Sequence, residues 1–128
     1  MAEPLLLTYN LKPMTADALN ALCREQGIRV RPVRREEYAL PIGLLAGIPA
    51  RASGEASAAE PFDDEMLVMC HMLSHQLDAF LSGMRQRGLP RIALKAVLTP
   101  FNVVWTSARL RDDLAREHDE IKRRNKNP

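Results

Sequence analysis

The sequence predicts a small α/β domain with a three-stranded, mainly parallel sheet in the order 2-1-3 and helices packed on it. Short apolar runs alternate along the chain with segments of helical periodicity, which favours strand–helix–strand units. The 128 residues provide one domain and one core, and 46% hydrophobic with 27% charged residues is an ordinary globular composition. Right-handed crossovers would place the first strand between the other two. A ferredoxin-like α+β fold is the alternative, and it needs one more strand.

The first three elements follow from apolar spacing and from turn residues. Residues 5–9 form an apolar run and are expected to be a buried strand. Thr15 is the expected cap of a helix that continues to Gln26, where Gly27 supplies a left-handed stop. Residues 28–33 alternate apolar side chains with arginine and are expected to be a second strand with one solvated face, and Pro32 suggests an edge position.

Residues 36–64 lack a regular period. A short helical turn is expected within residues 38–45, with Pro41 near its start. Residues 48–62 contain mostly small and polar residues and are expected to form a flexible insertion, either disordered or a lid.

The remaining elements are expected to be two helices around a third strand. The longest helix is expected to begin at Asp63 or Asp64 and end near Arg87, before Gly88. The third strand is expected over residues 92–99. A last helix is expected from a Thr106 cap to about residue 123, followed by a basic tail at residues 122–128. No internal repeat is expected.

The net charge of +2 is unevenly distributed. Residues 1–64 carry seven basic and nine acidic side chains, and residues 65–128 carry eleven and seven. Two basic clusters account for most of the excess: Arg85, Arg87, Arg91 and Lys95, and Lys122, Arg123, Arg124 and Lys126. A solvated basic surface is the favoured interpretation. An acidic partner or a phosphate group is the alternative, and nucleic acid is not expected.

The chain is expected to be cytoplasmic and not associated with a membrane. No apolar run approaches the ~18 residues of a membrane span, and Glu3 argues against a signal peptide. Cys23 and Cys70 lie in apolar patterns without a C-x-x-C spacing, which favours two buried thiols in a reducing compartment.

Three polar residues form a stripe on the expected long helix. His71, His75 and Asp78 follow helical spacing, and such a set can bind a divalent metal. An exposed polar face is nevertheless the favoured interpretation. No metal site and no cofactor are therefore expected. The alternative is a metal site formed by these three residues.

A second group of polar and aromatic residues follows the expected strands 1 and 3. In open α/β sheets, ligands bind beyond the carboxyl ends of the strands. The corresponding candidate ligand-binding residues are Tyr9, Asn10, Thr99, Asn102 and Trp105. Because these residue types are also common in turns, caps and helix–sheet contacts, a purely structural role is the favoured interpretation.

Residues 95–106 carry a family resemblance. They read K-A-V-L-T-P-F-N-V-V-W-T and resemble the closing motif K-A-V-x-T-x-x-N-x-x-W-[ST] of a small, uncharacterised prokaryotic family, a domain of unknown function. Residues 5–27 fit more loosely, and residues 34–64 do not fit. The resemblance implies a compact α/β domain and no known activity.

Two functions therefore stay open. The favoured one is a non-enzymatic protein-interaction or self-associating domain, with a homo-oligomer or a protein partner. The alternative is a small-molecule-binding or enzymatic domain with its site at the carboxyl ends of strands 1 and 3. Phosphate-loop, dinucleotide-binding and serine-hydrolase motifs are absent from the sequence, so no catalytic residue is assigned.

Overall fold

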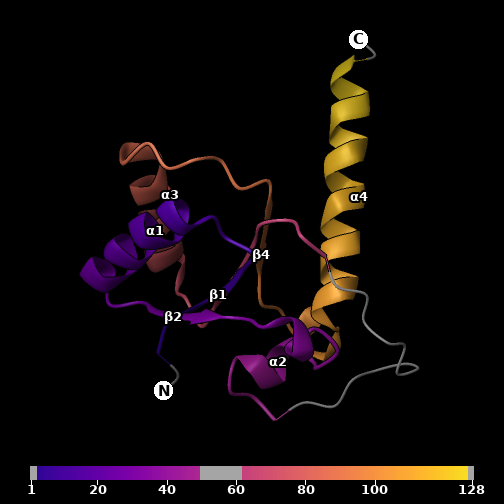
Figure 1. Ribbon diagram of the computed structural model, residues 1–128, viewed down its shortest axis with the longest axis horizontal. Coiled ribbons are helices and arrows are strands. Elements are labelled where there is room, and N and C mark those ends of the chain that lie inside the picture. The colour runs from indigo at the N-terminus through magenta and orange to yellow at the C-terminus, as the bar shows by residue number, and fades with distance from the viewer. Residues whose placement is uncertain (1–2, 50–61, 127–128) are drawn as a thin grey trace.

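The computed structural model describes residues 3–49 and 62–126. Figure 1 shows the path of the chain through its strands and helices. In chain order the elements are β1 (Leu5–Tyr9), α1 (Pro13–Gln26), β2 (Arg29–Pro32), the 3-10 helix η1 (Arg35–Glu37), α2 (Ile42–Leu45), β3 (Met66–Cys70), α3 (Ser74–Gln86), β4 (Leu94–Val97), the 3-10 helix η2 (Asn102–Val104) and α4 (Ser107–Lys126).

The sheet has four strands in the order β2-β1-β3-β4. The outer pairs, β1 with β2 and β3 with β4, are parallel, whereas the central pair of β1 and β3 is antiparallel. The prediction of an α/β domain with packed helices is confirmed. The predicted three-stranded sheet in the order 2-1-3 is wrong, because a strand that was not expected from the sequence lies between β1 and β4. Two of the three strand pairs are parallel, as expected for a mainly parallel sheet.

The missed strand, β3, occupies what was expected to be the start of the longest helix. All five of its residues are buried. In a strand that is buried on both faces, apolar and polar residues do not alternate, so the sequence lacks the two-residue period of a strand. Methionine and leucine are also good helix formers, which favoured the helix prediction. Pairing with β1 along five residues decides the conformation. His71 then ends the strand with a φ of 59°.

The chain contains an internal repeat that the sequence analysis did not detect. Residues 5–27 and 66–88 both form a strand, a turn and a helix, offset by 61 positions. Asn10 and His71 are equivalent and have φ values of 56° and 59°, and the equivalent Gly27 and Gly88 have 71° and 65°. Equivalent residues Leu7 and Val68 pair with each other at the centre of the sheet. The two strand–helix–strand units are therefore related by an approximate two-fold axis at this pair.

This arrangement also corrects the ferredoxin-like alternative. The chain order of strands and helices matches that fold, whose strand–helix–strand units are split by an intervening strand. Here β1 pairs directly with β2, and β3 with β4, so neither unit is split.

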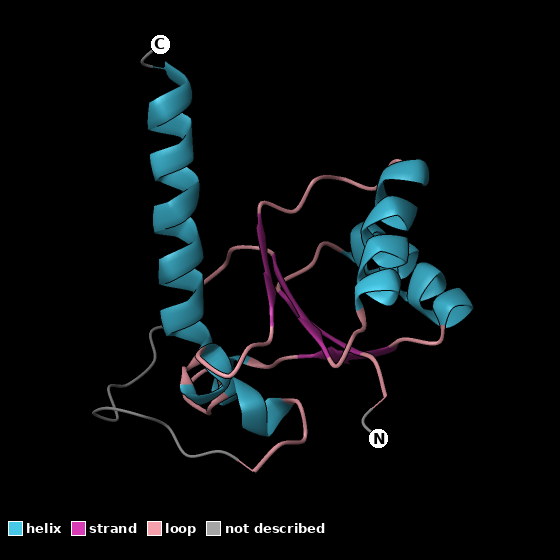
Figure 2. Cartoon of the chain, turned by 180° about the vertical axis from the view of Figure 1, so that it is seen from behind, coloured by secondary structure: helices cyan, strands magenta, loops and turns pink. Residues whose placement is uncertain are grey.

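The sheet separates two hydrophobic layers, and Figure 2 shows α1 and α3 on one side of it and α4 on the other. The α1–α3 layer buries Leu6, Leu19, Leu22, Leu67 and Phe80 together with neighbouring apolar side chains. The opposite layer is built from the other face of the sheet and from α2 and α4, with members that include Tyr9, Tyr38, Ile42, Phe62 and Leu110. Both faces of the sheet are therefore covered.

Local signals set most of the helix boundaries. Pro13 starts α1, where its fixed φ and missing N–H suit a first turn, so α1 begins before the predicted Thr15 cap. Gly27 ends α1 in the left-handed conformation, as predicted. The Thr106 hydroxyl accepts a bond of 3.2 Å from the Arg109 amide at the start of α4, which confirms its predicted capping role. Ile42 lies in the short helix α2 after Pro41, within the segment predicted as a helical turn.

The predicted insertion at residues 48–62 falls mostly on residues 50–61, outside the described residues. Phe62, at its end, is buried in the core. In the basic segment predicted as a tail, residues 122–126 continue α4 as helix. None of the described helices combines the length and the apolar character that a membrane span requires.

Candidate functional site

Tyr9 is fully buried under the start of α4. Its hydroxyl forms a hydrogen bond of 2.7 Å with the Ser107 hydroxyl, across 98 positions of sequence. Its ring lies 5.7 Å from the ring of Tyr38 and 5.8 Å from that of Phe62, and the latter two rings stack at 4.5 Å. Burial raises the pKa of Tyr9, so the hydroxyl stays protonated. Tyr9 therefore joins the end of β1 to the start of α4.

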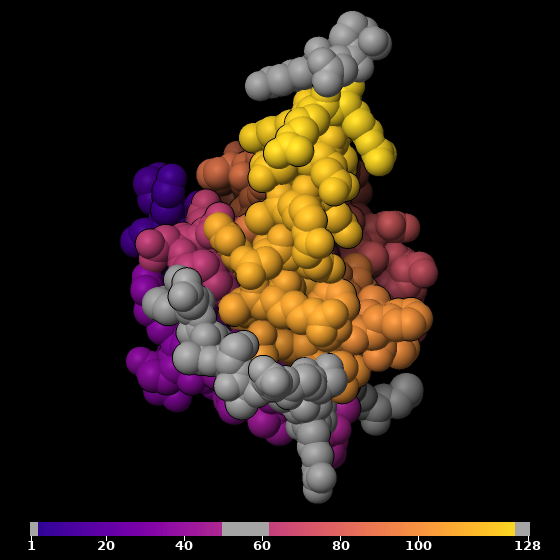
Figure 3. Space-filling view, turned by 90° about the vertical axis from the view of Figure 1, so that its right-hand side faces the viewer, coloured from indigo at the N-terminus to yellow at the C-terminus, as the bar shows by residue number. Residues whose placement is uncertain are grey.

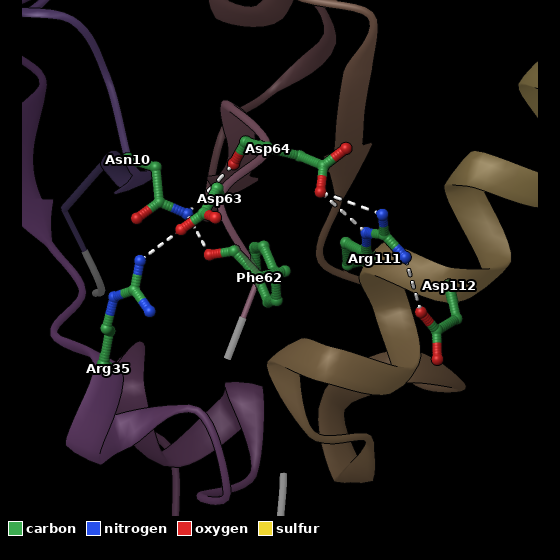
Figure 4. Close-up of polar contacts among 7 residues, drawn as sticks. All are labelled: Asn10, Arg35, Phe62, Asp63, Asp64, Arg111 and Asp112. Carbon is green, nitrogen blue, oxygen red and sulfur yellow. Dashed lines mark hydrogen bonds and ion pairs between the residues drawn. The ribbon is translucent and has the colours of Figure 1, made fainter. Parts of the chain in front are cut away.

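Asn10 organises the turn after β1, as Figure 4 shows. Its amide nitrogen donates to the carbonyl oxygens of Phe62 (2.7 Å) and Asp64 (3.1 Å). Its side-chain oxygen accepts a bond of 3.1 Å from the Tyr38 hydroxyl. These contacts hold residues 62–64 against the end of β1. Asparagine also tolerates the left-handed backbone that this turn requires.

Two ion pairs flank Asn10 on either side (Figure 4). Arg35 binds the carboxylate of Asp63, and two nitrogens of Arg111 lie 2.9 Å from Oδ1 of Asp64. Arg111 also contacts Asp112 at 3.0 Å. The pairs connect residues 63 and 64 to η1 and α4, and they are partly solvated. Surface pairs of this kind contribute about 0–1 kcal/mol each.

The segment after β4 is held by its own side chains. The Asn102 amide nitrogen donates to the Val97 carbonyl (3.0 Å), and its oxygen accepts from the Thr99 amide (2.9 Å). The Thr99 hydroxyl accepts from the amides of Phe101 (3.2 Å) and Asn102 (3.1 Å). Trp105 packs on the core beside α4, and the Arg109 guanidinium lies 4.3 Å above its ring. These contacts shape a tight turn.

The structure does not bring the five candidate ligand-binding residues together. Tyr9 pairs with Met66, and Met66 pairs with Leu94, the first residue of β4. The exit of β1 at Asn10 therefore lies near the start of β4, whereas Thr99 follows its end. The carboxyl ends of β1 and β4 were expected to lie side by side. This expectation was wrong, because β3 lies between the two strands and runs antiparallel to β1. Tyr9 and Trp105 share one core layer, and ligand binding at any of the five stays a prediction.

The alternative metal trio also rested on the wrong element. His71 lies in the turn after β3, and its Nε2 is 3.0 Å from the Ala46 carbonyl oxygen. His75 and Asp78 lie on α3, after the turn. The three residues therefore form no continuous helical stripe. Within residues 3–49 and 62–126, no group of three or more histidine, cysteine, aspartate or glutamate residues has a metal-binding arrangement.

Two residues that complete the contacts of Tyr9 and Asn10 were not expected from the sequence. Tyr38 and Ser107 come from η1–α2 and from the start of α4, far from β1 in the chain. No local pattern signals such distant partners. The internal repeat does leave a signal, since residues 5–27 and 66–88 share apolar spacing and a closing glycine.

The part of α4 beyond Leu114 is largely exposed. Leu110 is buried and Leu114 packs against the core, but Ile121, on the same helical stripe, is 55% exposed. Ile121 therefore lies outside the core, although helical spacing places it in line with Leu110 and Leu114. Figure 3 shows the yellow end of α4 standing above the rest of the molecule. Residues 118–124 are half-exposed or fully exposed.

One family match is found. Residues 65–121 match the family described as "Domain of unknown function (DUF3783)". The resemblance of the closing segment to a domain of unknown function is thereby confirmed, because residues 95–106 lie inside the matched range. The match begins at β3 and covers the second strand–helix–strand unit, η2 and most of α4. Comparisons with curated proteins and with solved structures found no match.

Proposed function

We propose that this chain is a non-enzymatic, self-associating module whose exposed end of α4 pairs with α4 of a second copy. The supporting observation is the charge order along this helix. Residues 112–120 contain five acidic residues and one basic residue, and residues 121–126 contain four basic residues and no acid. An antiparallel helix pair brings the acidic segment of each copy against the basic segment of the other. A parallel pair would place like charges together.

The exposed side chains define a register. The stripe that begins at Leu110 and Leu114 continues through His118 and Ile121. If the pair is centred between residues 119 and 120, Ile121 of one copy lies beside His118 of the other. That contact covers the most exposed apolar side chain of α4.

The charges in this region are available for such a contact. Asp113 pairs with Arg116 at 2.7 Å within α4. Within the described part of the chain, by contrast, no ion pair involves the acids at 117, 119 and 120 or the bases at 122, 123 and 124. The contact area is small, so the dimer is expected to be weak and to weaken further with added salt.

The test is a charge exchange measured by sedimentation equilibrium at low salt, on the order of 100 µM protein. One variant carries glutamate at positions 122–124, and a second carries lysine at positions 117, 119 and 120. Each variant alone is expected to be monomeric, because both segments then have one sign. Their equimolar mixture is expected to form heterodimers. A wild-type chain that stays monomeric, or variants that dimerise as well as wild type, would overturn the proposal.

Two controls separate pairing from helix stability. Circular dichroism of each variant shows whether α4 keeps its helix, since glutamates near a helix C-terminus weaken it. Ile121→Ser is expected to weaken the dimer, whereas Leu73→Ser, at a position 63% exposed on another helix end, is expected to leave it unchanged.

Disulfide cross-linking tests the orientation. A mixture of His118→Cys and Ile121→Cys chains is expected to cross-link faster than either variant alone. Arg123→Cys, on the opposite side of the helix, is the control and should not cross-link. Both natural cysteines are buried, so they do not compete. Faster cross-linking of the Ile121→Cys variant with itself than of the mixture would indicate a parallel pair and contradict the proposed arrangement.

A further inference from the structure

A basic cleft of about 440 Å³ opens between α3 and β4, on the opposite side of the sheet from α4. Its apolar floor includes Met84 and Ile92, which are buried, and Leu89, which is half-buried. Its polar lining is basic: Arg85, Arg91 and Lys95. Among the residues that the structure describes, no acidic side chain lines it. We call this site the basic cleft.

The basic cleft arises from a difference between the two repeated units. In the first unit Leu5 pairs with Arg29, 24 positions later, and in the second Met66 pairs with Leu94, 28 positions later. The second unit therefore has four extra residues between its helix and its closing strand. These are residues 90–93, and they supply Arg91 and Ile92 to the basic cleft.

The three cations have no counter-charge within the described residues. The Arg85 guanidinium donates only to the Ser82 hydroxyl at 3.3 Å, and the Lys95 ammonium donates to the Ile92 carbonyl. The nearby Arg87, by contrast, pairs with Glu25 and does not line the basic cleft. Burial, and then the charge of Arg91, lower the pKa of Lys95. An anion between these groups would relieve their mutual repulsion.

We propose that the basic cleft binds a small organic anion, whose carboxylate or phosphate group meets the three cations while its apolar body lies on the floor. Small-molecule sites commonly combine an apolar lining with a few convergent polar groups. Arginine matches the planar carboxylate and the phosphate oxygens with paired donors. This inference is independent of the dimer proposed above, because it uses a different face and different elements.

The test is an NMR titration of the full chain with phenyl phosphate, benzoate and inorganic phosphate. Amide shifts are expected in residues 81–95 with at least one of the two aromatic anions. Inorganic phosphate, which has no apolar body, is expected to bind at least about tenfold more weakly. Shifts that are absent from residues 81–95 with both aromatic anions at millimolar concentration would overturn the proposal. Equal affinity for inorganic phosphate would also overturn it.

Matched variants distinguish a built site from general attraction to a basic protein. Lys95→Met and Arg91→Gln are each expected to weaken binding about fivefold or more. Arg24 of the first unit is equivalent to Arg85 of the second. Arg24→Gln therefore removes one positive charge away from the basic cleft and is expected to change the affinity less than about twofold. Arg91 is exposed, so Arg91→Gln should fold even if Lys95→Met does not. Equal losses in Arg24→Gln and Arg91→Gln would refute a specific site.

Discussion

Substitutions at Asn10 and His71 separate backbone strain from hydrogen bonding. Both residues follow a central strand, and both have a left-handed backbone, with φ values of 56° and 59°. Asn10 makes three side-chain hydrogen bonds, whereas His71 makes one, to the Ala46 carbonyl. The two-fold relation between the units makes each position the natural control for the other.

The expected losses follow from these counts. Each partly buried hydrogen bond contributes about 1 kcal/mol, and alanine with a positive φ costs about 1 kcal/mol more than glycine. Asn10→Ala is therefore expected to lower the free energy of unfolding by about 4 kcal/mol, and Asn10→Gly by about 3 kcal/mol. His71→Ala should cost about 2 kcal/mol, and His71→Gly about 1 kcal/mol or less.

Urea unfolding followed by circular dichroism measures all four variants. The slope of free energy against urea should stay unchanged, so the midpoints report stability directly. Glycine also increases the entropy of the unfolded chain, but this effect is common to both positions and cancels in the comparison. If His71→Gly lowers the free energy of unfolding as much as Asn10→Gly does, the hydrogen bonds of Asn10 do not contribute about 1 kcal/mol each. If alanine and glycine are equivalent at both positions, the strain argument fails.

Two further predictions concern the α1–α3 layer and the thiols. A Cβ at Gly83 would lie 2.8 Å from Cδ1 of the buried Leu22 on α1, so Gly83→Ala is expected to cost about 1–3 kcal/mol of stability, less the gain of about 1 kcal/mol in helix propensity. Thermal unfolding measures the net change, and an increase in stability would show that the Leu22 side chain moves aside at little cost. Burial raises the pKa of both Cys23 and Cys70 to about 12, from an ordinary value of 9.0. The pKa of each thiol is higher in the folded protein than in the unfolded chain. The buried, protonated thiols therefore leave the stability unaffected below about pH 9, and the free energy of unfolding falls as the pH rises from about 9 toward 12. Native protein at pH 8 should also react slowly with a thiol reagent and quickly once unfolded, and fast native labelling would contradict the buried positions.

The local features of this protein can be predicted from its amino-acid sequence. The short, mostly apolar run of β1, the glycine stop after α1 and the Thr106 cap of α4 act within a few residues of chain, so their signals lie in the sequence. The family resemblance also lay there, because it depends on residue types alone.

The features that depend on distant partners emerge only when the chain is folded. Residues 66–70 are compatible with a helix or a strand, and pairing with β1 selects the strand. That choice gives the sheet its fourth strand, moves His71 into a turn and separates Asn10 from Thr99. The basic cleft likewise depends on where α3 and β4 pack, although its arginines and lysine are visible in the sequence. Hydrogen bonds and hydrophobic contacts between remote segments outweigh weak local propensities, so the sheet was settled by partners that no short stretch of sequence contains.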